Sequence, residues 1–324
     1  MPIHSRSPIV GVAIVLSAAS LFGMLGPLSR FAYDLGMQPV AFVAWRAAIA
    51  CLATAAFVAW RVARRGERLV HPSSLDRRAR VSLGVASLMG FTLNLSMFIA
   101  FDRITVALAL LGFYTYPVMI AVANVALGRE RLDRARGVAL ALAVAGMVAI
   151  VASQLDPAAG IRFDVIGILL TLGAAASQAV FVIVSRRGYR TVPADQATTV
   201  ILAGTVVCCL ALALATGALA TFAFPFEVPS VVPIVSFTGI FAAAIPSMLF
   251  LTGIRILGGT SAGILMLFEP VVGVALAAWL LAEGIAPIQV VGGLAILGAA
   301  FILQRAATPE ERVVSAPGLG PESA

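Results

Sequence analysis

Charged residues are scarce in this sequence, and lysine is absent. Only 11% of the 324 residues are charged, all 22 basic residues are arginine, and 61% of the residues are hydrophobic. Soluble domains are closer to one quarter charged, so this composition excludes an ordinary soluble globular protein. The mean hydropathy is +1.04, and the apolar runs are long enough for membrane helices of about 20 residues. These features indicate that lipid is the solvent of most of the chain.

Residues that support catalysis or metal binding are also few. The three cysteines, Cys51, Cys208 and Cys209, lie inside apolar segments at spacings that match neither a disulfide framework nor a metal site. The two histidines, His4 and His71, lie outside the apolar runs. The sequence contains no phosphate-binding glycine loop and no Ser-His-Asp set. It therefore predicts neither an enzyme nor an ATP-driven pump, and no cofactor.

Ten apolar segments follow one another, joined by short connections that Gly, Pro or charged residues mark. The first segment is too long for the apolar part of a cleaved signal peptide, so we interpret it as an uncleaved span. The polar tail at 305–324 is rich in Pro and Gly and is predicted to be disordered. The predicted spans are residues 9–30, 39–60, 81–101, 104–127, 137–154, 164–185, 197–220, 231–254, 260–281 and 286–304.

Loop charge predicts the orientation of these spans. Arginines gather in the loops after the second, fourth, sixth and eighth spans, whereas the opposite side holds little beyond Arg30, Arg103 and Arg162. The positive-inside rule therefore places both termini and the 305–324 tail in the cytoplasm. Arginines confined to short loops indicate topology rather than nucleic acid as a partner. On the external side, Asp102 and Arg103 are expected to form a local pair, with a gate as the alternative.

Two stretches repeat the same spacing of a mid-span proline and a glutamate at the helix exit. These are TVALALLGFYTYPVMIAVANVALGRE, ending at Glu130, and GGTSAGILMLFEPVVGVALAAWLLAE, ending at Glu283. Each repeat, 9–154 and 164–304, contains five spans, an odd number, so the second copy must be inverted relative to the first. Inverted repeats are common in secondary transporters, with the substrate site near the midplane. The alignment pairs Pro117 with Pro270, Tyr116 with Glu269, Glu130 with Glu283, and Asn94 with Ser247.

The order and spacing of several motifs resemble the EamA type of the drug/metabolite transporter superfamily over residues 9–305. The motifs are WRAAIA, SMFIAFDRITVALALLGFYTYP with LGRE, and MLFLTGIRILGGTSAGILMLFEPVVG with LLAE. The resemblance implies a ten-helix permease of the bacterial inner membrane with two EamA repeats and both ends cytoplasmic. It also implies export coupled to protons. The sixth span, SQAVFVIVSRRG, lacks an aromatic residue often found there, so the substrates of better-known members do not transfer to this chain.

Two ionisable residues lie well inside predicted spans, where a charge is costly unless it is paired or hydrated. Arg46 could hold a substrate carboxylate with its bidentate fork. The alternative is a structural role, in which Arg46 pairs with Glu269 or with carbonyls released nearby. Glu269 is a candidate proton carrier, because a buried carboxyl group can exchange a proton. The alternative is that its Glu-Pro step only bends and caps a helix.

Both repeated prolines indicate a central cavity. Pro117 and Pro270 lack an N–H group, so the carbonyls of Phe113 and Met266 lose their helix partners. In lipid such carbonyls are tolerated only where protein or a water-filled cavity satisfies them. The polar side chains predicted to bind substrate there, besides Arg46 and Glu269, are Asn94, Tyr114, Tyr116 and Gln178. Aromatic residues that could form a wall of the cavity, with lipid-facing positions as the alternative, are Phe22, Trp45 and Phe113.

The sequence thus predicts an all-α integral membrane protein that exports a small metabolite, such as an amino acid or an aromatic compound, by alternating access. Proton coupling is the favoured mode. The expected partners are the small-molecule substrate and the lipid bilayer, and the oligomeric state is left open between monomer and homodimer. A non-transporting membrane scaffold or regulatory protein is the alternative from a different class.

Overall fold

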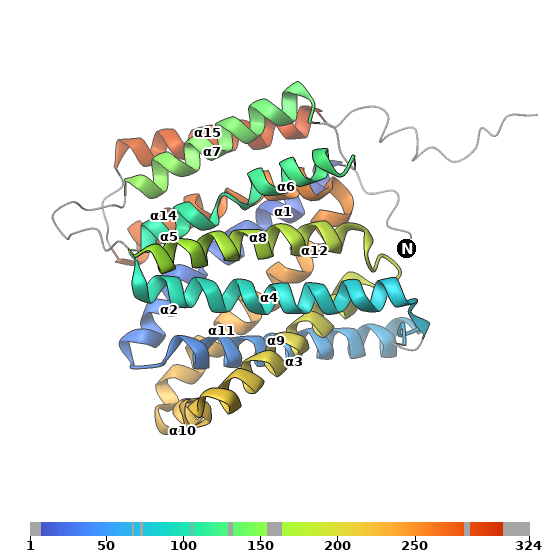
Figure 1. Ribbon diagram of the computed structural model, residues 1–324, viewed down its shortest axis with the longest axis vertical. Helices are drawn as coiled ribbons and strands as arrows, with labels where there is room; N and C mark the ends of the chain where they lie inside the picture. Colours follow the sequence, from blue (N-terminus) through green and yellow to red (C-terminus); the bar gives the residue numbers. More distant parts are fainter. Residues whose placement is uncertain are drawn as a thin grey trace, which may run out of the picture.

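The computed structural model describes residues 8–66, 68–71, 74–104, 106–128, 132–153, 164–281 and 286–306. Across these ranges the chain is helical with short connections, and its long helices lie roughly parallel in one bundle (Figure 1). The first-half helices are α1 (Pro8–Gly23), α2 (Leu25–Asp34), α3 (Pro39–Arg65), α4 (Arg77–Arg103), α5 (Val106–Phe113), α6 (Tyr116–Ala126) and α7 (Arg134–Ala152). The second-half helices are α8 (Val165–Arg187), α9 (Ala194–Thr216), α10 (Phe224–Glu227), α11 (Val232–Gly239), α12 (Ile245–Leu257), α13 (Gly259–Met266), α14 (Glu269–Leu281) and α15 (Pro287–Ala306).

Every predicted span falls on helical structure, although several helices are interrupted. Within the described residues, seven segments are long and apolar enough to cross a membrane, and Ile9–Gly23 and Pro287–Leu303 are shorter apolar helices. A π-helical turn, Ile240–Ala244, joins α11 to α12. The structure therefore shows an all-helical protein with several membrane-spanning helices, and the number of ten crossings stays a prediction.

Two helices break at the prolines that the sequence singled out. α5 ends at Phe113 and α6 begins at Tyr116, whereas α13 ends at Met266 and α14 begins at Glu269. Between α13 and α14 the backbone tightens, because the N–H groups of residues 267 and 268 bond to carbonyls three residues back, each at 3.1 Å. Both breaks occur at the same position relative to the proline, so the local structure repeats as the spacing does.

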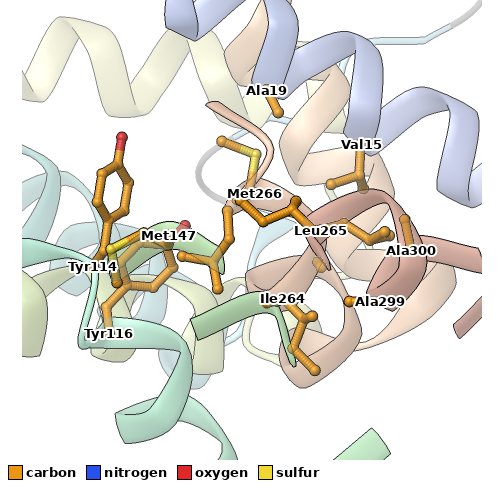
Figure 2. Packing of buried hydrophobic residues seen from close by; sticks show 14 of the residues in the cluster. Val15, Ala19, Tyr114, Tyr116, Met147, Ile264, Leu265, Met266, Ala299 and Ala300 are labelled. Carbon is orange, nitrogen blue, oxygen red and sulfur yellow. The ribbon is translucent and has the colours of Figure 1, made fainter. Parts of the chain in front are cut away.

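Corresponding helices of the two halves make corresponding contacts. α4 packs on α8 as α12 packs on α1, and α5 and α6 pack on α8 as α13 and α14 pack on α1. Two pairs join counterparts directly, namely α3 with α9 and α7 with α15, and α6 packs on α13 where the two broken segments meet. The largest buried apolar cluster is formed by α1, α6, α7, α8, α12, α13 and α15. Figure 2 shows Met266 of α13 between Ala19 of α1 and the tyrosines at the α5–α6 break.

The α7–α15 pair makes the most extensive helix contact of the fold, and it depends on two glycines. A Cβ atom on Gly146 would lie 2.5 Å from the carbonyl oxygen of Gly292, and a Cβ atom on Gly292 would lie 2.5 Å from that of Gly146. Small residues at such crossings let helix backbones approach closely in membranes. The two backbones are therefore in contact at this point.

We expect Gly146→Ala to destabilise the protein by about 1–3 kcal/mol, because the added methyl group must push two backbones apart. The matched control is Gly137→Ala on the same helix, where a Cβ atom meets no heavy atom within 4 Å. That control should be neutral or slightly stabilising, since Ala favours helix over Gly by about 0.5–1 kcal/mol. Thermal unfolding of both purified variants in detergent would check this, and equal midpoints would contradict it.

Arg103 at the end of α4 joins the start of α8. Its Nη1 donates to Asp164 Oδ2 at 3.0 Å, whereas its expected pair with Asp102 stays a prediction. Asp164 also caps α8, because its carboxylate accepts from the N–H groups of Ile166 and Gly167. The hydrogen bond from Arg103 lowers the pKa of Asp164. The side chain of Asp102, together with Glu130, Glu283 and residues 307–324 of the predicted tail, lies outside the described residues.

Candidate functional site

A cavity of about 250 Å³ lies between the two halves of the chain. Helices α1 to α6 of the first half and α8, α9, α12, α13 and α14 of the second half contribute residues to its wall. All six residues predicted to bind substrate line it: Arg46, Asn94, Tyr114, Tyr116, Gln178 and Glu269. Pro117 and Pro270 each follow one of these residues in the first turn of α6 and α14. The structure thus brings the predicted site residues together around one space.

Arg46 is held by hydrogen bonds to neutral groups. Its side chain is 7% exposed, and Nη2 donates to Asn94 Oδ1 at 2.8 Å while Nη1 donates to the carbonyl oxygen of Ala242 at 3.4 Å. That carbonyl lacks its usual α-helical partner because Pro246 has no N–H group. Asn94 in turn donates from Nδ2 to the carbonyl oxygen of Gly90 at 2.8 Å, which fixes the orientation of its amide.

The structural pair between Arg46 and Glu269 does not form. Among the described residues, no carboxylate lies within ion-pair distance of Arg46. The other structural interpretation, contact with a released carbonyl, is what the Ala242 oxygen provides. Arg46 is thus a buried cation whose described partners are uncharged, and a buried charge without a counter-charge is costly.

Glu269 is the first residue of α14 and lines the cavity. No described residue donates a hydrogen bond to its carboxylate. Its position at the positive end of the α14 dipole favours a negative charge there. The backbone of Glu269 is fixed by α1, because a Cβ atom on Gly23 would lie only 2.8 Å from the Glu269 carbonyl oxygen. The cavity therefore holds one cation and one carboxylate that are not paired with each other.

Aromatic and sulfur-containing side chains form much of the remaining wall. The ring of Phe113 lies 5.5 Å from that of Tyr114 and 5.1 Å from that of Tyr116, measured between centroids. Phe22 and Phe113 line the cavity, so of the two positions that the sequence left open, the cavity wall rather than the lipid face holds for them. Lining residues that sequence reasoning missed include Met97, Phe181, Thr198, Ile201, Leu202, Thr205, Ser247, Phe250 and Met266. The spacing of 198, 201, 202 and 205 on one helical face was the available signal for part of this set.

Two other side chains within the apolar segments, Trp45 and Asn124, lie elsewhere. Trp45 is not among the lining residues; its indole Nε1 donates to the carbonyl oxygen of Phe222 at 3.0 Å, and its ring meets that of Phe226 edge-on at 5.6 Å. Asn124 also lies away from the cavity wall and donates to Thr260 Oγ1 at 3.3 Å. Across the part of the chain that the structure describes, no group of three or more His, Cys, Asp or Glu side chains is placed to hold a metal ion.

Several membrane-spanning helices around a cavity with buried polar groups define a multi-pass membrane protein. The profile of the EamA-like transporter family matches residues 9–152 and 165–305, and the chain belongs to this family. A solved crystal structure of a protein matches 92% of this chain and 98% of its own, with a TM-score of 0.67 and 20% sequence identity. At that identity the likeness shows the fold alone. A search of curated proteins found no match.

Proposed function

We propose that the chain is a secondary transporter that crosses the bacterial inner membrane ten times, as two inverted five-helix repeats with both termini cytoplasmic. It exports a small zwitterionic metabolite, an amino acid with an apolar or aromatic side chain, by alternating access through the central cavity, and Glu269 couples this movement to protons. The observation that carries the proposal is the pair of opposite, mutually unpaired charges, Arg46 and Glu269, on the wall of one cavity.

The residues that line the cavity support the proposed repeat, because many of them correspond between the two halves. A shift of 153 residues, which relates Pro117 to Pro270, also relates lining residues of α4–α6 to lining residues of the second half. A shift of 156 residues does the same for α1–α3 against α8 and α9. The first shift pairs Gly90 with Ala243, Asn94 with Ser247, Met97 with Phe250, Phe113 with Met266, and Tyr116 with Glu269. The second pairs Phe22 with Gln178, Leu25 with Phe181, and Arg46 with Leu202.

A close contact at a glycine in one half also has a counterpart in the other half under the same two shifts. A Cβ atom on Gly11 would lie 2.8 Å from atoms of both Ile256 and Leu257. A Cβ atom on Gly167, its counterpart at 156 residues, would lie 2.6 Å from Ile104, the counterpart of Leu257 at 153 residues. Since each half contains an odd number of predicted spans, related halves of this kind favour the inverted arrangement, with the cavity at their interface.

The two charged residues have uncharged counterparts in the other half, so the cavity wall is not symmetric at these positions. The counterpart of Arg46 is Leu202, and the counterpart of Glu269 is Tyr116. A solute with a carboxylate and an ammonium group would complete both charged sites in one orientation only, through charge-assisted hydrogen bonds. The aromatic side chains and Met97 and Met266 suit an apolar or aromatic body beside these groups. An α-amino acid with such a side chain has all three features.

Glu269 supports the proposed proton coupling. A carboxyl group on the cavity wall, without a hydrogen-bond donor among the described residues, can take up a proton when the solute leaves. It is then neutral during the return step, in which a bare buried charge would be costly. This exchange links each solute movement to one proton and needs no second carboxyl group on the cavity wall.

Flux in proteoliposomes tests the proposal. We expect purified protein to move labelled L-phenylalanine faster than empty liposomes do, and to accumulate it only when a pH gradient is present. Flux that is the same with and without the gradient would remove the coupling. No flux of phenylalanine, phenethylamine or 3-phenylpropionate above that of empty liposomes would favour the scaffold or regulatory alternative.

A further inference from the structure

One end of the cavity is closed by a compact apolar floor. Its buried members come from α4, from the α8–α9 turn, from α9 and from α12: Ala79, Leu83, Ala86, Tyr189, Val192, Ala197, Ile201 and Leu251. Ile201 and Leu251 also line the cavity, so the floor begins where the cavity ends. On the proposed topology this end faces the cytoplasm.

Two polar contacts fasten the α3–α4 side of the floor to the start of α9. Arg61 Nε lies 2.7 Å from Asp195 Oδ2, and Arg61 Nη2 donates to Asp195 Oδ1 at 3.4 Å. The two side chains are only 11% and 12% exposed. Next to them, the amide of Gln196 accepts from the N–H of Val70 at 3.1 Å and donates to its carbonyl oxygen. These four residues, Arg61, Val70, Asp195 and Gln196, are called the latch below.

The α8–α9 turn is fixed from the other side by α12. Arg255 is 7% exposed, and Nη1 donates to the carbonyl oxygen of Val192 at 2.8 Å while Nη2 donates to that of Tyr189 at 3.3 Å. Its guanidinium group lies over the Tyr189 ring, 5.5 Å from the centroid. The turn is therefore attached to α12. The latch joins the start of α9, next to this turn, to α3 and to the α3–α4 connection.

The opposite end of the same helix pair has no such contact. The shift of 156 residues relates Arg61 to Gly217, and it relates Asp195 to Pro39. Neither glycine nor proline has a side chain that can form an ion pair, so the symmetric position at the other end of α3 and α9 cannot form this contact. At that end, Trp45 donates a hydrogen bond to the carbonyl oxygen of Phe222.

We propose that the latch biases the transporter, in the absence of solute, toward the state that is closed at the cytoplasmic end, and that the Arg61–Asp195 ion pair breaks once in every transport cycle. This inference rests on the proposed alternating access. A repeat with perfect symmetry would have equal free energies for its two closed states. Among the described residues, an ion pair with both partners largely buried is found at this end and none at the other. The two states therefore differ in free energy, and the latched state predominates.

Distances between spin labels test this without any solute. The labels are placed at Arg64→Cys and Arg190→Cys, two exposed positions on either side of the latch, after the three native cysteines are replaced by serine. In Asp195→Asn we expect the ratio of longer to shorter distances to rise about two- to fivefold, the size expected for one ion pair. The charge exchange Arg61→Asp with Asp195→Arg should restore the original distribution.

Two controls separate the latch from a general disturbance. Asp133→Asn removes a carboxylate at the N-terminus of α7, near the same end of the bundle, and asparagine can still cap that helix; the label distances should not change. Labels at Leu35→Cys and Leu219→Cys, at the opposite end, should not report a longer distance in Asp195→Asn. An unchanged distribution in Asp195→Asn would overturn the inference. Because the readout needs no solute, a failure of the substrate or coupling assignment leaves it testable.

Discussion

Replacing Arg46 with glutamine is expected to lower the affinity for L-phenylalanine by roughly 30- to 4,000-fold. This range corresponds to the loss of about 2–5 kcal/mol when one partner of a buried, hydrogen-bonded charge pair is removed. The carboxylate of the solute would lose its only cation, because the described residues offer no other basic side chain on the cavity wall. Binding measured by isothermal titration calorimetry in detergent checks the value.

The ligand series distinguishes lost recognition from lost folding. Phenethylamine has no carboxylate, so its affinity for Arg46→Gln should stay within about threefold of that for the parent protein, which also reports an intact cavity. Arg46→Lys should recover only part of the affinity for phenylalanine, because lysine lacks the planar fork. Arg64→Gln, which removes an exposed arginine from the same helix, is the matched control. Unaltered phenylalanine affinity in Arg46→Gln would show that this arginine is structural.

Glu269→Gln is expected to uncouple transport from the proton gradient. Glutamine has nearly the same shape but cannot take up or release a proton, so accumulation driven by a pH gradient should fall by about an order of magnitude or more. Exchange of labelled for unlabelled phenylalanine across the membrane requires no net proton movement and should persist at a reduced rate. The measurement is flux into proteoliposomes with an imposed gradient, followed by exchange at equal pH.

The same variant should show the opposite ligand preference to Arg46→Gln. Phenethylamine loses its counter-charge in Glu269→Gln and should bind at least about tenfold more weakly, whereas 3-phenylpropionate should be little affected. Glu227→Gln on α10, an exposed glutamate outside the cavity, should behave as the parent protein does. If accumulation in Glu269→Gln still follows the pH gradient, the proton is carried by another group.

Much of the candidate site could be predicted from the sequence, because polar groups inside apolar runs are rare and costly. Arg46 and Glu269 stand out against their neighbours for that reason, and the repeated prolines mark the two helix breaks. The partners could not be predicted. Whether Arg46 meets Glu269 or Asn94 depends on the rotation and depth of α3 relative to α4 and α14, and periodicity within one helix carries no information on that relation.

Two contacts between distant segments could not be predicted either. Arg103 pairs with Asp164 because the end of α4 and the start of α8 meet in the fold, and the sequence carries no signal of that meeting. Trp45 packs against Phe222 and Phe226 because the connection between α9 and α11 folds into short helical turns instead of a loop. Contacts between segments far apart in the sequence decided each case.

The number of crossings shows how helix breaks limit a count made on single helices. Residues 9–30 were predicted as one span, but in the structure α1 ends at Gly23 and α2 begins at Leu25. Neither piece alone is long enough to cross a bilayer core of about 30 Å at 1.5 Å per residue. Hydropathy over the whole run therefore predicts one crossing where the structure has two shorter helices.

Because α7 and α15 pack closely on each other, the fit of the protein to the membrane can be separated from its selectivity for the solute. Among the described residues, neither helix contributes to the cavity wall, and exposed side chains such as Val138, Val148, Leu294 and Phe301 cover their outer faces. Provided that Gly146 and Gly292 remain, these outer faces can change in length and apolar character without altering which solute binds. The chain can thereby be adjusted to membranes of different thickness independently of its selectivity.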